Sequence, residues 1–208
     1  MPRFPIHAKT KAQLLDITTP DSASQPECLP WMLYDSQNLA TAAGTQSVPF
    51  FVTQSADTTI SNMESSGQLP DPQFFEIWWI GISVLFTALS TSATIAGNIN
   101  DLIQILNTGR TTFELNLSNK RYGPWPMEAA HALGGVSGYF TGAPASPGTD
   151  SFANNGPQDG GFWVGGQIVI PPKVGFNITL RTGAAITLAQ TPVLVRVCMT
   201  GALYRRVL

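Results

Sequence analysis

Apolar residues gather in short stretches of the chain after residue 47, and most of these stretches alternate with polar residues. The stretches are residues 48–54, 74–86, 111–118, 162–172, 174–181 and 192–207. The alternation predicts that the following side chains face inward: Phe113, Leu115, Leu117, Phe162, Val164, Ile168, Ile170, Phe176, Ile178, Leu180, Val193, Val195, Val197 and Met199. Short alternating segments separated by Gly and Pro turns are typical of antiparallel strands with one buried face. The pattern therefore predicts an all-β chain that folds as a two-sheet sandwich.

Residues 74–86 differ from the other stretches because both faces of the predicted strand are apolar. The even positions carry Phe74, Trp78, Ile80, Ile82, Val84 and Phe86, and the odd positions carry Phe75, Ile77, Trp79 and Leu85. A strand that is apolar on both faces is buried on both faces. One face of a sandwich strand meets the core. The other face is therefore predicted to meet a loop, the N-terminal segment or a neighbouring subunit.

Helical periodicity is restricted to short segments. Residues 98–106 place Ile99, Leu102, Ile103 and Leu106 at helical spacing, with Asn98 or Asn100 as N-cap and Gly109 as the stop. A second helix of one or two turns is predicted after Pro126. Between them and the last strands, residues 134–161 form a loop rich in Gly, Pro, Ser and Asn. A loop of this length in a compact domain is usually a functional or contact loop.

The first 45 residues have no sustained periodicity and read as an extended N-terminal arm. Their prolines are Pro2, Pro5, Pro20, Pro26 and Pro30, and their apolar residues are Phe4, Ile6, Leu14, Leu15, Trp31, Met32 and Leu33. So many apolar anchors predict that the arm lies against another surface instead of in water. The predicted organisation is thus an arm over residues 1–45 and one domain over residues 46–208.

Charge is scarce in this chain of 208 residues, in which Lys and Arg number 11 and Asp and Glu number 13. Charged residues make up 12% of the sequence, against roughly 25% in an average soluble domain. The net charge of −2 provides no electrostatic footprint for nucleic acid or a membrane surface. Such sparse charge predicts that much of the surface is covered by other molecules.

Residues 77–100 contain a long uncharged stretch, but only its first part is strongly apolar. About 20 apolar residues are needed for a spanning helix, and the stretch is rich in β-branched and aromatic residues. A strand followed by a polar loop is therefore expected, with no membrane insertion. The N-terminus has no continuous apolar run, so no signal peptide is expected.

The chain offers little material for catalysis. Its two histidines are His7 and His131, and residues 135–139 fail the nucleophile pattern G-x-S-x-G because Tyr139 stands at the last position. The carboxylates considered as a catalytic pair are Glu64, Asp71, Glu76 and Glu114, and those considered for calcium with nearby amides are Asp150, Asn154, Asn155 and Asp159. We expect no enzyme activity and no cofactor or metal. The two cysteines, Cys28 and Cys198, lack metal or redox spacing.

Several runs of this sequence resemble a known group of proteins. They are NMESSGQLPDPQFFEIWWIGI (62–82), TTFELNLSNKRYGPWPMEAA (111–130), GGVSGYF (134–140), IPPKVGFNITL (170–180) and VLVRVCMTGALYRRVL (193–208). The runs resemble the jelly-roll structural proteins of bacteriophage virions over residues 48–208. The resemblance implies a single eight-stranded antiparallel jelly roll with one or two short helices, and a place in the capsid of the virion after assembly in the host cytoplasm.

Within that reading, the expected role is that of a cement, decoration or minor capsid protein that stabilises the shell. The alternatives are a major capsid protein that forms the shell itself and a carbohydrate-binding sandwich module for host attachment, which the tryptophans would serve. The expected partners are further copies of the chain, as a trimer, and other capsid proteins. The residues expected at the interfaces are Phe4, Ile6, Trp31, Met32, Leu33, Phe75, Ile77, Trp79, Tyr139 and Phe140. The only candidates for nucleic-acid contact are Arg3, Lys9 and Lys11, whose three charges provide weak affinity.

Overall fold

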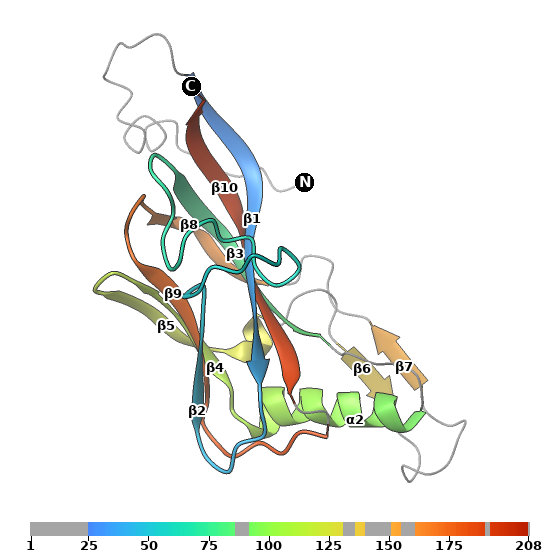
Figure 1. Cartoon of the computed structure of the whole chain (residues 1–208). Coiled ribbons are helices and arrows are strands. Elements are labelled where there is room, and N and C mark those ends of the chain that lie inside the picture. Colours follow the sequence, from blue (N-terminus) through green and yellow to red (C-terminus); the bar gives the residue numbers. More distant parts are fainter. Residues whose placement is uncertain are drawn as a thin grey trace.

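The computed structural model describes residues 25–85, 92–130, 136–139, 151–154, 161–189 and 192–207. Two antiparallel sheets of four strands each face one another and enclose a common core (Figure 1). The predicted all-β sandwich is confirmed. The expected total of eight strands is too low, because β6 (Val136–Tyr139) and β7 (Ser151–Asn154) form a two-stranded ribbon outside the two sheets.

The first sheet has the strand order β1-β10-β3-β8. Its members are β1 (Gln25–Leu39), β10 (Val193–Val207), β3 (Phe74–Leu85) and β8 (Phe162–Ile170). The second sheet has the order β2-β9-β4-β5. Its members are β2 (Gln46–Phe50), β9 (Phe176–Thr182), β4 (Thr112–Leu117) and β5 (Lys120–Pro126). Every pairing within the two sheets is antiparallel.

The strand β1 corrects the predicted extent of the arm. Residues 25–39 pair with β10 along their whole length, from Gln25 opposite Val207 to Leu39 opposite Val193. Prolines at positions 26 and 30 suggested an irregular segment, but an edge strand tolerates proline where the missing N–H faces away from the sheet. The part of the predicted arm that lies outside the described residues is 1–24.

A β-bulge in β3 explains why that strand is apolar on both faces. Ile77 pairs with Gly201 and Trp79 pairs with Thr200, so Trp78 is an extra residue in β3. An inserted residue reverses the alternation of the strand. The core side is therefore occupied by Phe75 and Ile77 before the bulge, and by the even positions Ile80 and Ile82 after it, all of them fully buried.

Inward positions read from the alternation are largely confirmed. The predicted residues that are buried are Phe113, Leu115, Leu117, Ile168, Ile170, Phe176, Ile178, Leu180, Val193, Val195, Val197 and Met199. Phe162 and Val164 are half-buried against the same core. Aromatic rings join the two sheets, since the ring centroid of Phe113 in β4 lies 5.9 Å from that of Phe162 in β8.

The predicted helix exists but begins earlier than the periodicity indicated. The α-helix α2 (Ser92–Ile103) continues as the π-helical turn η1 (Gln104–Thr108), and the N–H of Gly109 closes it on the carbonyl of Gln104. Gly109 thus ends the helix as predicted. Ile103, which was expected on the apolar face, is 48% exposed, whereas Asp101 is buried and accepts a hydrogen bond from the N–H of Ala189. The second predicted helix is the 3₁₀ turn η2 (Met127–Ala129) after Pro126.

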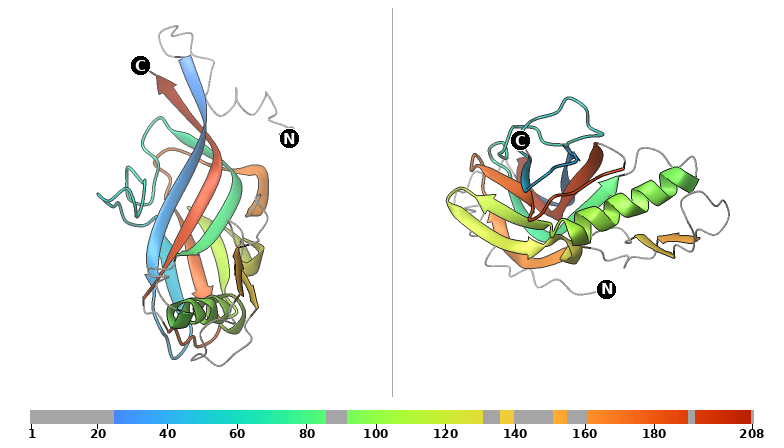
Figure 2. Two further views of the ribbon diagram at one scale, coloured as in Figure 1. Left: turned by 90° about the vertical axis from the view of Figure 1, so that its right-hand side faces the viewer. Right: turned by 90° about the horizontal axis from the view of Figure 1, so that it is seen from below.

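The helix α2 lies across one end of the sandwich, and β10 ends at the opposite end (Figure 2). Among the described residues, no helix is long and apolar enough to cross a membrane.

Candidate functional site: the exposed apolar surface around Trp31

Two large apolar side chains in the middle of β1 are open to solvent. Trp31 is 43% exposed and Met32 is 45% exposed. They line a shallow groove of about 400 Å³ together with Pro30, Asn62 and Thr200, which we call the Trp31 groove. The next residue along β1, Leu33, is buried. Because successive side chains of a strand alternate between its faces, Trp31 points to the same face of β1 as Leu33, and Met32 points to the other face.

The loop after β2 forms the far wall of the Trp31 groove, and Asn62 fixes it to β1. The side-chain amide of Asn62 donates to the carbonyl of Met32 at 2.7 Å, and its Oδ1 accepts from the N–H of Tyr34 at 2.8 Å. Both polar ends of Asn62 are thus occupied by the backbone of β1. The groove consequently presents mainly apolar surface to an incoming molecule.

Arg196 in β10 holds the same loop from the outer face of the sheet. Its Nε donates to Oγ of Ser36 at 2.9 Å, and its Nη2 donates to the carbonyl of Thr59. Its guanidinium lies 5.3 Å from the centre of the Tyr34 ring, and the Tyr34 hydroxyl donates to the carbonyl of Thr58. These contacts make the groove wall a fixed part of the fold.

A row of side chains crosses the outer face of the first sheet from Met32. In the pairing of the four strands, Met32 lies opposite Thr200, Thr200 opposite Trp79, and Trp79 opposite Trp163. Directly paired residues point to the same face of a sheet. We call these four residues the outer row. Four strands about 4.8 Å apart make the row roughly 14 Å long.

Two tryptophans form the far end of the outer row. The ring centroids of Trp79 and Trp163 lie 4.6 Å apart with their planes at 56°, and Trp163 is 43% exposed. The rings touch but do not form one flat platform. The aromatic surface of the outer row is therefore uneven. An uneven surface favours contact with the side chains of another protein over stacking of a planar ligand.

The structure separates the interface residues expected from the sequence into three groups. Trp31, Met32 and Trp79 lie on the surface described above, with Trp79 half-buried. Leu33, Phe75 and Ile77 are buried in the core of this chain, so they are not available at an interface. The residues outside the described part of the chain are Phe4, Ile6, Phe140, Arg3, Lys9 and Lys11, and Tyr139 is described only as the end of β6.

Sequence reasoning missed Thr200 and Asn62 and did not place Trp163 in the interface. Asn62 has no signal in a single sequence, since its role depends on the path of the loop. Trp163 could have been found, because it alternates with the inward residues Phe162 and Val164 and must face outward.

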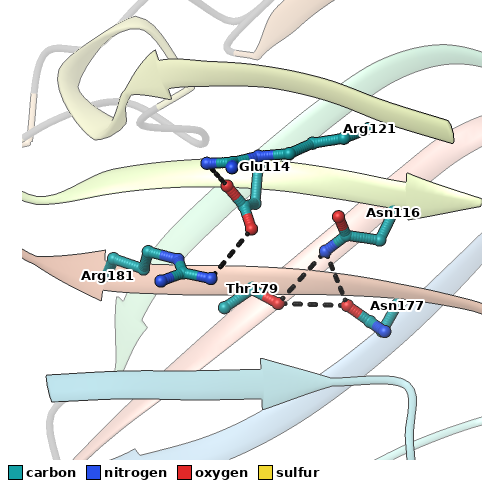
Figure 3. A network of polar contacts seen from close by, with 6 residues as sticks. All are labelled: Glu114, Asn116, Arg121, Asn177, Thr179 and Arg181. Carbon is teal, nitrogen blue, oxygen red and sulfur yellow. Dashed lines mark hydrogen bonds and ion pairs between the residues drawn. The ribbon is translucent and has the colours of Figure 1, made fainter. Parts of the chain in front are cut away.

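The outer face of the second sheet is polar, in contrast to that of the first (Figure 3). The Glu114 carboxylate in β4 is 3% exposed and is paired by Arg181 of β9, with Nη2 3.2 Å from Oε1, and by Arg121 of β5 at Oε2. Beside it, the side-chain amide of Asn116 and the hydroxyl of Thr179 each donate to Oδ1 of Asn177 at 3.0 Å. The network ties three strands together and uses both oxygens of the buried carboxylate.

The four carboxylates considered for catalysis have separate partners on different elements. Glu76 accepts a hydrogen bond from the Tyr204 hydroxyl, Asp71 pairs with Lys173, and Glu64 accepts from Gln73. No group of three or more His, Cys, Asp or Glu side chains gathers within the described ranges. The residues considered for calcium, Asp150, Asn155 and Asp159, and both histidines lie outside those ranges, and of Asn154 only the backbone of β7 is described.

The two cysteines face the same side of the first sheet but lie far apart along it. Cys28 is opposite Tyr204 and Cys198 is opposite Tyr34, so five residues of β1 separate the two cysteines in register. Burial raises the pKa of the Cys198 thiol. Neither thiol is part of a disulfide.

Comparison of the chain with protein-family models, with curated proteins and with solved structures finds no match.

Proposed function

We propose that the chain is a jelly-roll structural subunit of a bacteriophage virion, which stabilises the capsid as a cement, decoration or minor capsid protein. The fold supports this proposal through the nested order in which the strands pair. Setting aside the β6–β7 ribbon, the first strand of the sandwich pairs with the last, β2 with β9, β3 with β8, and β4 with β5. A long hairpin rolled into two four-stranded sheets, as in a jelly roll, has this nested order.

The observation that carries the proposed role is the exposed apolar surface formed by the Trp31 groove and the outer row. Interfaces of permanent assemblies are apolar and poor in charge at their centres. Trp31 and Met32 expose large apolar side chains in a chain with only 12% charged residues. A neighbouring subunit that covers this surface would remove it from water and would hold the groove wall formed by Asn62 in place.

The N-terminal segment is the part of the chain that we propose to reach a neighbour. It has 24 residues before Gln25, the first residue of β1, and it carries Phe4 and Ile6. An extended chain of this length spans roughly 80 Å. That exceeds the length of β1, whose 15 residues span roughly 50 Å, so the segment of one subunit can reach the Trp31 groove of the next. The expected assembly is a trimer.

The alternative within the same class is a major capsid protein that builds the shell itself. Both roles need the same apolar surface, so they differ in the geometry of the assembly and not in its chemistry. The low content of Lys and Arg, 11 residues in 208, favours the accessory role because a shell lining the genome has charge to neutralise.

A carbohydrate-binding module is the second candidate function, and the pair Trp79–Trp163 is the observation that favours it. Sugar-binding sites combine an aromatic platform with polar groups that fix the hydroxyls. Against this function, the two rings are tilted by 56° and the amide of Asn62 is already occupied by β1. Titration of the tryptophan fluorescence with a panel of glycans tests it, and a saturable change with one glycan would favour this function over the first.

The proposed function is tested by light scattering and negative-stain electron microscopy of the purified full chain. Discrete trimers or small oligomers are the result expected for a cement or minor capsid protein, and closed particles would indicate a major capsid protein. A chain that stays monomeric at high concentration and binds no capsid would contradict the proposal.

A further inference from the structure

The strand β1 is the last strand of the first sheet, and β10 is the one strand that pairs with it among the described residues. Its other edge, which we call the free edge, is contacted in the described part of the chain by the loop after β2, through an isolated bridge between Asp35 and Ser61. The strand is 15 residues long. A long free edge presents a row of backbone N–H and C=O groups to which a strand of another molecule can add. A chain with such an edge needs features that prevent this addition.

The direction of the backbone groups in β1 follows from the contacts of Asn62. Asn62 binds the N–H and the carbonyl of Tyr34 and the carbonyl of Met32. In an antiparallel strand, the backbone groups of alternate residues point to opposite edges. The register of β1 against β10 is continuous from Gln25 to Leu39. The even-numbered residues of β1 therefore all point their backbone groups to the free edge.

Both prolines of β1 stand at these even positions. Pro26 and Pro30 have the same parity as Met32 and Tyr34, and a proline has no N–H to offer. The positions of the two prolines thus remove donors from the free edge and leave the bonding to β10 intact. This also explains how a strand containing two prolines forms the longest ladder in the first sheet.

The second half of the free edge, from Met32 to Leu39, is closed by side chains, and we call it the lower half. The N–H of Tyr34 is taken by Oδ1 of Asn62, and the N–H of Ser36 is taken by Oδ1 of Asp35 at 3.0 Å. Asp35 itself is buried, and its Oδ2 accepts from the N–H of Phe51 at 2.6 Å, so its orientation is fixed. Positions 26, 30, 34 and 36 consequently offer no donor to an incoming strand.

We infer that the free edge of β1 is closed, so that the β1 of a second copy cannot add to it as a further strand. Pro26 and Pro30 close the upper half, residues 25–31, and Asn62 and Asp35 close the lower half, residues 32–39. Contacts of β1 with a neighbour then proceed through the side chains of the Trp31 groove and not through backbone pairing. This inference does not depend on the proposed function, since it holds for a monomer as well as for an oligomer.

Replacing the two prolines opens the upper half of the edge. The variant Pro26→Thr/Pro30→Thr restores backbone N–H donors at positions 26 and 30. Together with Cys28 and Met32, they form an unbroken row of four donors on the free edge. The substitutions add no large apolar surface. We expect an oligomer of higher mass than the parent in light scattering, with a mass that rises with concentration. Hydrogen exchange is expected to show concentration-dependent protection of the amides of residues 26–32.

Two controls separate strand addition from misfolding. The single variants Pro26→Thr and Pro30→Thr each restore one donor, and each is expected to associate less than the double variant. Pro192→Thr, at an exposed proline just before β10, is expected to leave the mass unchanged. An unchanged mass and fast-exchanging amides in Pro26→Thr/Pro30→Thr would overturn the inference, as would an equal rise in mass in Pro192→Thr.

The lower half is tested by Asn62→Ala, with Asn119→Ala in the exposed turn after β4 as the matched control. We expect the amide of Tyr34 to exchange faster in Asn62→Ala at low concentration and to regain protection as the concentration rises. An amide of Tyr34 that stays as protected as in the parent would show that Asn62 does not close this part of the edge.

Discussion

The hydroxyl of Tyr204 donates a 2.8 Å hydrogen bond to Oε2 of Glu76 on the outer face of the first sheet. Tyr204 is 1% exposed, and with Ala202, Phe74 and Trp78 it forms a small apolar cluster separate from the core. Burial, and then the neighbouring Glu76 carboxylate, raise the pKa of Tyr204 above its usual range. The bond therefore stabilises a carboxylate that has little access to water.

Tyr204→Phe is expected to destabilise the fold because it leaves the Glu76 carboxylate without its donor. The expected loss is about 1–3 kcal/mol in the free energy of unfolding near neutral pH. Denaturant unfolding followed by circular dichroism measures it, with Tyr122→Phe, a half-buried tyrosine of β5, as the control. A variant as stable as the parent would show that this hydrogen bond contributes nothing net.

The same pair predicts a pH dependence at the alkaline end. Above about pH 10 the unfolded chain releases the proton of Tyr204, whereas the folded chain retains it, so the parent loses stability as the pH rises. Tyr204→Phe has no such proton. The stability difference between parent and variant is therefore expected to be constant below about pH 10 and to shrink above it. A difference that does not change between about pH 8 and about pH 11 would contradict the raised pKa.

Gly201 is required at the bulge of β3 because the two strands approach closely there. A Cβ at position 201 would lie 1.8 Å from the carbonyl oxygen of Glu76, which is backbone and cannot rotate away. Gly201→Ala is expected to cost roughly 3 kcal/mol or more, at the upper end of overpacking effects. Gly175→Ala, where nothing lies within 4 Å, is the control and should stay within about 0.5 kcal/mol of the parent. Equal stability of the two variants would refute the bulge geometry.

Arg121 and Arg181 both pair with the Glu114 carboxylate, so replacing one of them leaves the other as a partner. Removing both Arg121 and Arg181 leaves a carboxylate that is 3% exposed without a cation. The double variant is expected to lose roughly 3–5 kcal/mol, as for other broken buried pairs. Adding Glu114→Gln to that background should recover part of the loss, since a neutral amide is cheaper to bury. A triple variant that is no more stable than the double variant would show that the two arginines do not stabilise the Glu114 carboxylate.

Two truncations distinguish the N-terminal segment from the strand that follows it. Deleting residues 1–24 should leave the denaturation midpoint unchanged and abolish assembly, because β1 and the core remain intact. Deleting residues 1–40 removes β1, including the buried Leu33 and Leu39, and should yield an unfolded or aggregated chain. Thermal unfolding and light scattering report the two properties. Normal assembly of the shorter truncation would remove the N-terminal segment from the proposed interface.

The strands with one buried face could be predicted from the sequence because their alternation is regular. In β9, for example, Phe176, Ile178 and Leu180 all face the core as expected. The bulge in β3 could not be predicted. An inserted residue shifts the alternation of a strand, and this shift is not visible where both faces are apolar. The only local signal is Gly201 on the partner strand, which reveals a close approach only once the pairing is known.

The candidate site was predicted in part. Trp31 and Met32 stood out as apolar anchors among prolines, and they are exposed as an interface requires. Leu33 was assigned to the interface but is buried, because residues 25–39 form a strand in which Leu33 faces the core on the side opposite to Met32. The outer row could not be foreseen, since Met32, Trp79 and Trp163 meet only through the register of four strands.

The central claim is that another subunit covers the apolar surface around Trp31. Sedimentation velocity of the full chain and of Trp31→Ser/Met32→Ser tests it most directly, with Ile103→Ser, a similarly exposed residue on α2, as the control. We predict that the parent and Ile103→Ser sediment as the same oligomer and that the double variant sediments as a folded monomer. A monomeric parent, or a double variant that assembles like the parent, would contradict the claim.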